Sequence, residues 1–378
     1  MLQLYDSFSR QKREFQPLNP SKVSMYVCGI TPNNATHLGH AFNYVAFDVL
    51  FRFLKHKGYA VTYVQNATDI NDGDDVIKQA RDEGTTWQEI ARRWIDHFHA
   101  QMRALNVLPT THYVLATSVI DEIIAINESL IQSGHAYEKN GNVYFDISTF
   151  SSYGELSRYS EAQMSMISRE RGNDPDDPNK RNPLDFVLWI HADQEPNWAS
   201  PWGNGRPGWH IECTAMSKQY LGDRIDIHGG GRDLLYPHHE SERAQTECAT
   251  GIPPFVQTWM HIGMVMFEGE KMSKSLGNLV LVQDLLERYD AQVIRWLLLS
   301  HHYRHPWEFE ESELEDLVPV YSQIRARLQE PAKGDLQVVE RWLDDDLNTP
   351  EVLRYLISEC AGETLKSALI LLGFALEN

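Results

Sequence analysis

The sequence predicts an α/β fold built around a doubly wound parallel sheet, and three stretches of the chain lead to this prediction. Residues 23–31 (VSMYVCGIT) are apolar and rich in β-forming residues, residues 38–57 repeat their apolar positions at helical spacing, and residues 60–64 (AVTYV) are again apolar. Residues 32–34 (PNN) break the first run, and Gly58 ends the second. A strand, a helix and a strand in this order predict a βαβ unit of a Rossmann-like sheet, with ligands at the carboxyl ends of its strands.

The rest of the chain is expected to divide around this sheet. The predicted domains are a split catalytic domain at residues 1–95 and 200–300, a connective insertion at 96–199, and a helical C-terminal region at 301–378. Residues 141–147 predict a strand within the insertion, and residues 170–183, with three prolines, predict a surface loop. A second β-rich stretch at 224–231 (RIDIHGGG) runs toward a helix that begins after Pro237.

Composition and charge predict a cytoplasmic protein. Four cysteines in 378 residues are too few for a disulfide scaffold, so they are interpreted as thiols or metal ligands in a reducing compartment. The first residues form no apolar signal region, and no stretch reaches the roughly 18 apolar residues of a membrane span, so no membrane partner is expected. The formal net charge of −19 offers no general attraction for a polyanion.

Two short motifs predict a site for a nucleoside triphosphate. Residues 37–40 (HLGH) open the predicted helix, where unpaired backbone N–H groups and the helix dipole favour phosphate, and His37 and His40 would stabilise its charge. Residues 271–275 (KMSKS) carry Lys271 and Lys274, whose ammonium groups would close over the β- and γ-phosphates. Each motif alone is also typical of ordinary surface residues, so the specificity of the signal comes from their joint occurrence in this order.

A third group of residues is typical of a metal site. His238 and Glu242 are four residues apart on a predicted helix and would share one face, and the fold would have to bring Cys28 and Cys213 to them. Two thiolates, an imidazole and a carboxylate suit zinc. The alternative is that the two cysteines are small buried core residues, because the spacing is not that of a local zinc finger.

The motifs at 37–40 and 271–275 resemble the HIGH and KMSKS signatures of the class I aminoacyl-tRNA synthetases, and the resemblance covers nearly the whole chain. It implies the class I synthetase type of Rossmann-like sheet, with an inserted connective domain and a stem-contact region after residue 300. It also implies ATP with magnesium as co-substrate. The resemblance to the cysteine-activating members of this family implies that Cys28, Cys213 and His238 would hold a zinc ion, with Glu242 as a fourth ligand.

The same resemblance implies a set of residues that line an aminoacyl-adenylate. Asn66 and Thr68 fall at the end of the second strand, Trp209 is broad enough to close a pocket, and the glycines before Asp233 permit close approach of a ligand. The implied set is Cys28, Gly29, Ile30, Thr31, Asn43, Asn66, Ala67, Thr68, Trp209, Gly231, Arg232, Asp233 and Val265.

Four segments are shared with two related families, the cysteinyl-tRNA synthetases and the mycothiol ligases: GRPGWHIEC, DIHGGG, PHHE and KMSKSLGN. Both families activate L-cysteine as cysteinyl-AMP. A pocket sized for cysteine cannot strongly reject serine by shape, so a soft zinc ion with a vacant position would select the thiol.

Other segments resemble the mycothiol ligases, namely residues 30–41 (ITPNNATHLGHA), 170–175 (ERGNDP) and 278–282 (NLVLV), together with a short end after residues 344–350 (DDDLNTP). The expected reaction is therefore transfer of the cysteinyl group to the amine of glucosaminyl-inositol. Charging of tRNA is the alternative, disfavoured by the acidic charge and short C-terminal region. A different cysteine acceptor and a non-catalytic synthetase-like protein remain further alternatives.

Overall fold

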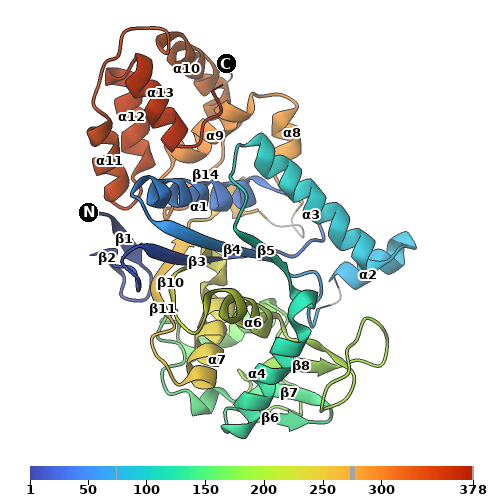
Figure 1. The fold of residues 1–378 in the computed structure, drawn as a ribbon. Coiled ribbons are helices and arrows are strands. Elements are labelled where there is room, and N and C mark those ends of the chain that lie inside the picture. The colour runs from blue at the N-terminus through green and yellow to red at the C-terminus, as the bar shows by residue number, and fades with distance from the viewer. Residues whose placement is uncertain (74, 273–276, 377–378) are drawn as a thin grey trace.

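The computed structural model describes residues 1–73, 75–272 and 277–376 (Figure 1). Its helices are α1 (Leu38–His56), α2 (Asp75–Glu83), α3 (Trp87–Ala104), α4 (Ile120–Gln132), α5 (Glu161–Glu170), α6 (Trp209–Leu221), α7 (Glu240–Thr250), α8 (Val282–Leu286), α9 (Ala291–Ser300), α10 (Glu311–Arg327), α11 (Leu336–Asp344), α12 (Thr349–Glu359) and α13 (Gly362–Leu371). Short helical turns are η1 (Ala116–Val119), η2 (Ile147–Thr149), η3 (Arg232–Leu234) and η4 (Leu235–His239).

The strands form a central sheet and three smaller ones. They are β1 (Gln3–Asp6), β2 (Gln11–Glu14), β3 (Lys22–Ile30), β4 (Ala60–Ala67), β5 (His112–Leu115), β6 (Ala136–Lys139), β7 (Asn142–Phe145), β8 (Phe186–His191), β9 (Gly205–Pro207), β10 (Ile225–Gly231), β11 (Val256–Ile262), β12 (Val265–Phe267), β13 (Glu270–Lys271) and β14 (Trp307–Glu308). The central sheet has the order β11-β10-β3-β4-β5, and all of its neighbouring strands are parallel. The predicted α/β fold with a parallel sheet is therefore confirmed.

The strand order places a topological switch point between β3 and β10. The chain runs from β3 outward through β4 and β5 on one side, and from β10 to β11 on the other, so the connections leave the sheet in opposite directions at this point. Val27 of β3 lies opposite Gly229 of β10. Ligands bind at such a crevice, beyond the carboxyl ends of the strands.

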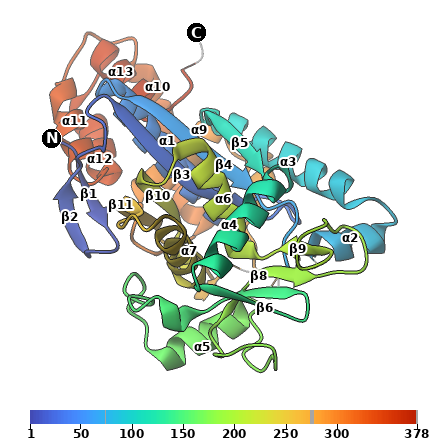
Figure 2. The ribbon, with the colours of Figure 1, turned by 60° about the horizontal axis from the view of Figure 1, so that its bottom comes forward.

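Helices cover both faces of the central sheet, α1 on one face and α6 on the other (Figure 1). Both helices bury apolar residues against the sheet, and α1 is almost entirely buried because α9 and the C-terminal helices cover its outer side. The strands β6, β7, β8 and β9 form a separate antiparallel sheet that projects with α5 away from the C-terminal helices (Figure 2).

One strand of the predicted insertion belongs to the central sheet. The strand β5 pairs with β4, Val64 lying opposite His112, so the chain leaves this sheet only after Leu115 and not at residue 96. Its four residues are too few to show an alternating pattern in the sequence, and their partner strand is remote in the chain. The division of the whole chain into domains otherwise stays a prediction.

A buried ion pair joins the C-terminal helices to the sheet domain. Arg295 of α9 pairs with Asp48 of α1, and both side chains are inaccessible to solvent. The Arg295 guanidinium also donates to the carbonyl oxygens of Leu105, at 2.7 Å, and Leu372, at 2.9 Å. Every partner is needed because an unpaired buried charge strongly destabilises a fold. Among the described residues, no helix is both long and apolar enough to cross a membrane.

Candidate active site

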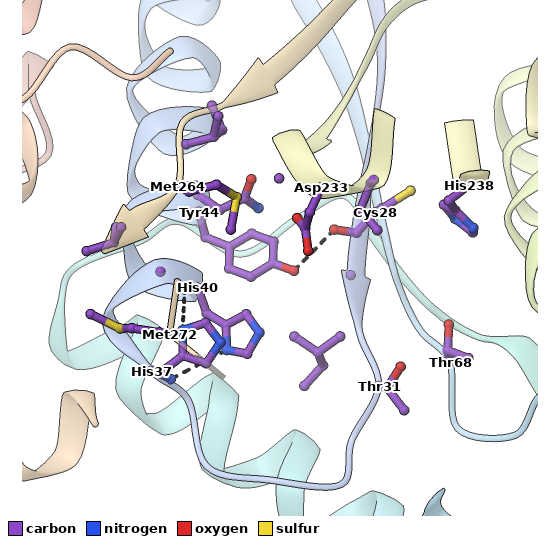
Figure 3. Close-up of a pocket in the computed structure, with 18 of the residues that line it drawn as sticks. Cys28, Thr31, His37, His40, Tyr44, Thr68, Asp233, His238, Met264 and Met272 are labelled. Atoms are coloured by element: carbon purple, nitrogen blue, oxygen red, sulfur yellow. Dashed lines mark hydrogen bonds between the residues drawn. The ribbon is translucent and has the colours of Figure 1, made fainter. Parts of the chain in front are cut away.

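A cavity of about 370 Å³ opens at the switch point between β3 and β10. Sixteen residues predicted from the sequence line it: Cys28, Gly29, Ile30, Thr31, His37, His40, Asn43, Asn66, Thr68, Trp209, Cys213, Gly231, Asp233, His238, Val265 and Lys271. Ala67, Arg232 and Glu242 are not among its lining residues. Lys274 lies outside the described residues. In Figure 3 the two histidines of the first motif lie on one side of the cavity, and Cys28 and His238 lie on the other.

The HLGH motif forms the N-terminus of α1. The Nδ1 atom of His37 accepts the backbone N–H of His40, and Nδ1 of His40 accepts the backbone N–H of His37, each at 3.4 Å. The two rings stack with their centroids 3.7 Å apart. Because each Nδ1 is an acceptor, each neutral ring carries its proton on Nε2 and can donate it to a ligand.

Both imidazoles are neutral near pH 7. Burial lowers the pKa of His37 to about 4, and the ammonium of Lys271 acts in the same direction, while Asp233 opposes them. Burial also lowers the pKa of His40, with the neighbouring His37 adding to the effect. The motif therefore offers hydrogen-bond donors to a phosphate, and not two fixed positive charges.

The carboxylate of Asp233 forms ion pairs with two cationic side chains at the cavity. The Oδ2 atom of Asp233 lies 2.8 Å from Nζ of Lys271 and 2.9 Å from Nη2 of Arg171. Burial alone would raise the pKa of Asp233, but the two cations outweigh burial and hold this pKa below its ordinary value. The sequence did not single out Arg171 as a site residue, although it lies in the segment 170–175 that was treated as a family marker.

The predicted metal ligands meet in a buried cluster. The donor atoms of Cys28, Cys213, His238 and Glu242 all lie within 4.8 Å of one another. Nε2 of His238 is 3.1 Å from Oε1 of Glu242, and the thiol of Cys28 is 3.6 Å from the same oxygen. The predicted single helix for the last two ligands is wrong in detail: His238 lies in the preceding turn η4, which is interrupted by the extended conformation of Tyr236, and Glu242 lies in α7.

Four further histidines surround this cluster, and the sequence analysis missed all of them: His210, His228, His239 and His261. Cys28 Sγ lies 3.3 Å from Nε2 of His239 and 3.6 Å from Nε2 of His228, so these two rings make a second possible ligand group with Cys28 and Glu242. Nδ1 of His239 and Nε2 of His261 are hydrogen-bonded at 2.8 Å, and the Nδ1 atoms of His210 and His238 are hydrogen-bonded at 2.9 Å. The sequence did contain a signal for three of these four histidines, because they lie within the GWHIEC, DIHGGG and PHHE segments that carry the family resemblance.

Chemically, the cluster fits a zinc ion. Its donors are two thiols, an imidazole and a carboxylate, the ligand types that zinc prefers. Burial lowers the pKa of His238 to about 3, so its imidazole is neutral, as a metal ligand must be. Such a concentration of solvent-inaccessible thiol, imidazole and carboxylate groups is costly for a fold unless they are neutral, paired or coordinated.

The wall between the two ends of the cavity is built from close backbone contacts. The N–H of Gly29 donates to Oδ1 of Asn66 at 2.8 Å, and Nδ2 of Asn66 donates to Thr68 at 3.3 Å. The ring of Trp209 stacks on His238 with centroids 4.5 Å apart. The hydroxyl of Tyr44, a lining residue absent from the predicted set, donates to the carbonyl of Cys28 at 3.1 Å.

Curated relatives match nearly all of the chain. It is 46% identical to the cysteine–tRNA ligase of Shewanella amazonensis over 361 residues, which is 93% of this chain and 77% of that protein. It is 43% identical to the cysteine–tRNA ligase of Legionella pneumophila over 397 aligned positions, 99% of this chain and 85% of that protein.

Solved structures share the fold. The methionyl-tRNA synthetase of Mycobacterium tuberculosis bound to methionyl-adenylate superposes with a TM-score of 0.65 at 15% identity, covering 93% of this chain and 84% of that one. A putative arginyl-tRNA synthetase of Campylobacter jejuni gives a TM-score of 0.59 at 16% identity, over 95% of this chain and 94% of that one.

These findings correct two predictions made from the sequence. Transfer of cysteine to glucosaminyl-inositol was the expected reaction, and tRNA was a disfavoured partner. Relatives named cysteine–tRNA ligases, 43–46% identical over almost the whole chain, contradict both. The net charge was a poor guide because a nucleic-acid surface depends on where cations lie, and not on their sum over a protein.

The family assignment comes from the catalytic region itself. Residues 14–318 match the model of the tRNA synthetases class I (C) catalytic domain. This span includes both ends of the cavity, from Cys28 and the HLGH motif to Lys271. The chain therefore belongs to the family of class I tRNA synthetase (C) catalytic domains.

Proposed function

We propose that this protein activates L-cysteine with ATP as cysteinyl-AMP and transfers the cysteinyl group to tRNA. The observation that carries the proposal is the pairing, within one cavity, of a buried thiol–imidazole–carboxylate cluster with the phosphate motif at the start of α1. The cluster suits recognition of a thiol, and the helix start suits a triphosphate. The relatives named cysteine–tRNA ligases support tRNA as the acceptor.

In the first step an oxygen of the cysteine carboxylate attacks the α-phosphorus of ATP, and the bond to the β-phosphate oxygen breaks to release pyrophosphate. His37 and His40 donate their Nε2 protons as hydrogen bonds to phosphate oxygens, whose negative charge rises toward the transition state. Lys271 leaves Asp233 and binds the departing phosphates. Magnesium enters the site bound to ATP. Lys274 is proposed to bind the phosphates together with Lys271.

In the second step a ribose hydroxyl at the 3′ end of tRNA attacks the carbonyl carbon of cysteinyl-AMP. The ester bond forms, the bond from that carbon to the phosphate oxygen breaks, and AMP leaves, with the proton of the ribose hydroxyl passing to the departing phosphate. The adenylate is surrounded and shielded from water by Gly29, Asn66, Thr68, Trp209 and Val265. Ile30, Thr31, Asn43, Ala67, Gly231 and Arg232 complete the proposed binding set.

Selection of cysteine over serine is assigned to the metal cluster. Cys28, Cys213, His238 and Glu242 would hold the zinc, which when bound supplies a soft Lewis acid that prefers a thiolate to a hydroxyl. The hydrogen bond between His210 and His238 fixes the orientation of the ligand ring. The stacked Trp209 prevents that ring from swinging into the cavity.

Two assays test this proposal in sequence. The first measures exchange of labelled pyrophosphate into ATP with cysteine or serine as the amino acid, and strong preference for cysteine is expected. The second measures attachment of labelled cysteine to tRNA. Absence of cysteine-dependent exchange would favour a non-catalytic synthetase-like protein, whereas exchange without tRNA charging would refute the acceptor and retain the adenylation.

A further inference from the structure

The segment at residues 170–175 (ERGNDP) has no role in the reaction described so far, yet it delivers a cation to the active site. Arg171 directly follows α5 in the insertion, and its side chain lines the cavity next to Asp233. The side chain is 30% exposed, and its guanidinium Nη2 lies 2.9 Å from Asp233 Oδ2. The insertion therefore reaches into the adenylation site through this residue.

The position of Arg171 is built into the local fold. Helix α5 begins with a capping box between Ser160 and Gln163, and near its end the hydroxyl of Ser168 lies 3.0 Å from that of Tyr236, two residues before His238 in the chain. Gly172 then turns the chain with φ of 91°, a conformation that favours glycine.

The residue after this turn is also fixed. The side chain of Asn173 donates to the carbonyl of Pro183 at 3.1 Å and accepts a hydrogen bond from Lys180. The polar residues of the segment thus hold the loop against the insertion, while Arg171 points the other way, into the cavity.

The two cations on Asp233 differ in what they can do next. Lys271 has to leave Asp233 in order to bind phosphates, and its departure removes half of the positive charge at this carboxylate. Both cations use Oδ2. Within the described part of the chain, no protein group donates to Oδ1, and a Cβ atom on Gly231 would lie only 2.7 Å from it. The glycine thus leaves room for a substrate donor at Oδ1.

We propose that Arg171 is a positioning residue for adenylation: it remains on Oδ2 of Asp233 after Lys271 has moved to the phosphates, and so keeps the carboxylate charged and oriented toward a substrate hydroxyl or ammonium. Lys271 is the exchangeable partner, and Arg171 is the permanent one. A planar guanidinium suits the permanent role, because it is always charged and holds a fixed direction toward a carboxylate. This inference rests on the proposed cysteine activation.

The electrostatic surroundings of Asp233 make the proposal measurable. The charged and titratable groups that face it come from four places in the fold, and they are Arg171 after α5, Lys271 in β13, His37 and His40 at the start of α1, and His261 in β11. Burial lowers the pKa of all three histidines, so they are neutral near pH 7. Once Lys271 leaves, Arg171 is the one remaining cation among these named groups.

The test compares Arg171→Met and Arg171→Lys with wild type in cysteine-dependent pyrophosphate exchange. Arg171→Met is expected to lower kcat and kcat/KM for ATP by the same factor, about tenfold or more, with KM unchanged, because its effect appears only after Lys271 has left Asp233 for the phosphates. Arg171→Lys keeps the charge and should restore most of kcat. Arg169→Met is the matched control, since Arg169 is 62% exposed and pairs only with Asp176 among the described residues.

A double-variant cycle separates this role from a structural one. If Arg171 acts through Asp233, then Arg171→Met should have little additional effect in an Asp233→Asn background. Thermal unfolding of every variant excludes loss of fold as the cause. Unchanged kcat and kcat/KM in Arg171→Met would overturn the inference, as would a loss confined to KM or equal effects with and without Asp233. Absence of exchange in the wild-type protein would instead overturn the proposed function.

Discussion

The backbone N–H of Gly29 donates to Oδ1 of Asn66 at 2.8 Å, which joins the carboxyl ends of β3 and β4 immediately beside the metal cluster. The regular pairing of these strands shifts between Val27 and Ile30, so the side-chain amide takes the place of a ladder hydrogen bond. A Cβ atom on Gly29 would lie 1.5 Å from the backbone oxygen of Asn66. The absence of a side chain at Gly29 is therefore required for this wall of the cavity.

Gly29→Ala is expected to force β3 and β4 apart and to reduce the free energy of unfolding by about 1–3 kcal/mol, the usual effect of overpacking. Cysteine-dependent pyrophosphate exchange should fall more than unfolding alone explains, because Cys28 moves with the strand. Urea unfolding and exchange assays measure the two effects. Gly73→Ala is the control, since the three atoms nearest to its added methyl group, among the described residues, all belong to the Asn71 side chain, at 3.1 Å or more.

Cys213→Ser removes one thiol from the metal cluster and should lower both zinc content and apparent affinity for cysteine, each by about 10- to 100-fold or more. Zinc content is measured by atomic absorption, independently of activity. Cys248→Ser is the matched control because Cys248 is a half-buried thiol outside the cluster. Normal zinc content in Cys213→Ser would contradict the assignment of this residue as a ligand.

Lys271→Met should raise the pKa of His37 from about 4 toward its ordinary value. Burial is the larger cause of the lowered pKa and remains, but the repulsion from the ammonium is lost while the attraction of Asp233 stays. An imidazole proton resonance, assigned with a His37→Gln variant, reports this titration in the unliganded protein. A midpoint that stays near 4 or falls would show that Lys271 does not act on this ring.

Wild-type stability should decline as the pH falls from about 6.5 toward 4. The pKa of His37 is depressed in the folded state, so the unfolded chain binds more protons in this interval and is favoured by acid. Urea unfolding at several pH values should therefore show a steeper decline for wild type than for His37→Gln. Parallel pH dependences of the two proteins would contradict the depressed pKa.

Arg295→Met should reduce the free energy of unfolding by about 3–5 kcal/mol, because it leaves the buried Asp48 without one of its partners. The carbonyl groups of Leu105 and Leu372 also lose their donors. Arg354→Met removes an exposed pair with Glu351 and should change stability by about 1 kcal/mol or less. Similar urea midpoints for both variants would show that the buried pair is dispensable.

Local sequence patterns were sufficient for the βαβ unit. The first strand, helix and second strand are observed at Lys22–Ile30, Leu38–His56 and Ala60–Ala67, close to their expected positions. Periodicity reports such elements because each is long and has a buried face. The four-residue β5 gave no comparable pattern, so its membership of the central sheet was not foreseen.

The acceptor could not be read from the segments that were used to choose it. Residues 170–175 were interpreted as a marker of a different ligase, whereas in the structure the Arg171 side chain lines the candidate active-site cavity and pairs with Asp233. The residues of a short segment near an active site are constrained by the first step that two related reactions share as much as by the step in which they differ.

By itself, the sequence determined the α/β class and supplied the motifs at 37–40 and 271–275 and the identities of the thiol, imidazole and carboxylate groups, because these depend on residue type and local spacing. Tertiary structure alone decided that Cys28, Cys213, His238 and Glu242 share one buried site, that four more histidines surround it, and that Arg171 and Lys271 meet on Asp233. These contacts join residues up to 214 positions apart. Parallel strands and an insertion bring them together, and no local pattern in a chain encodes the distance between such remote side chains.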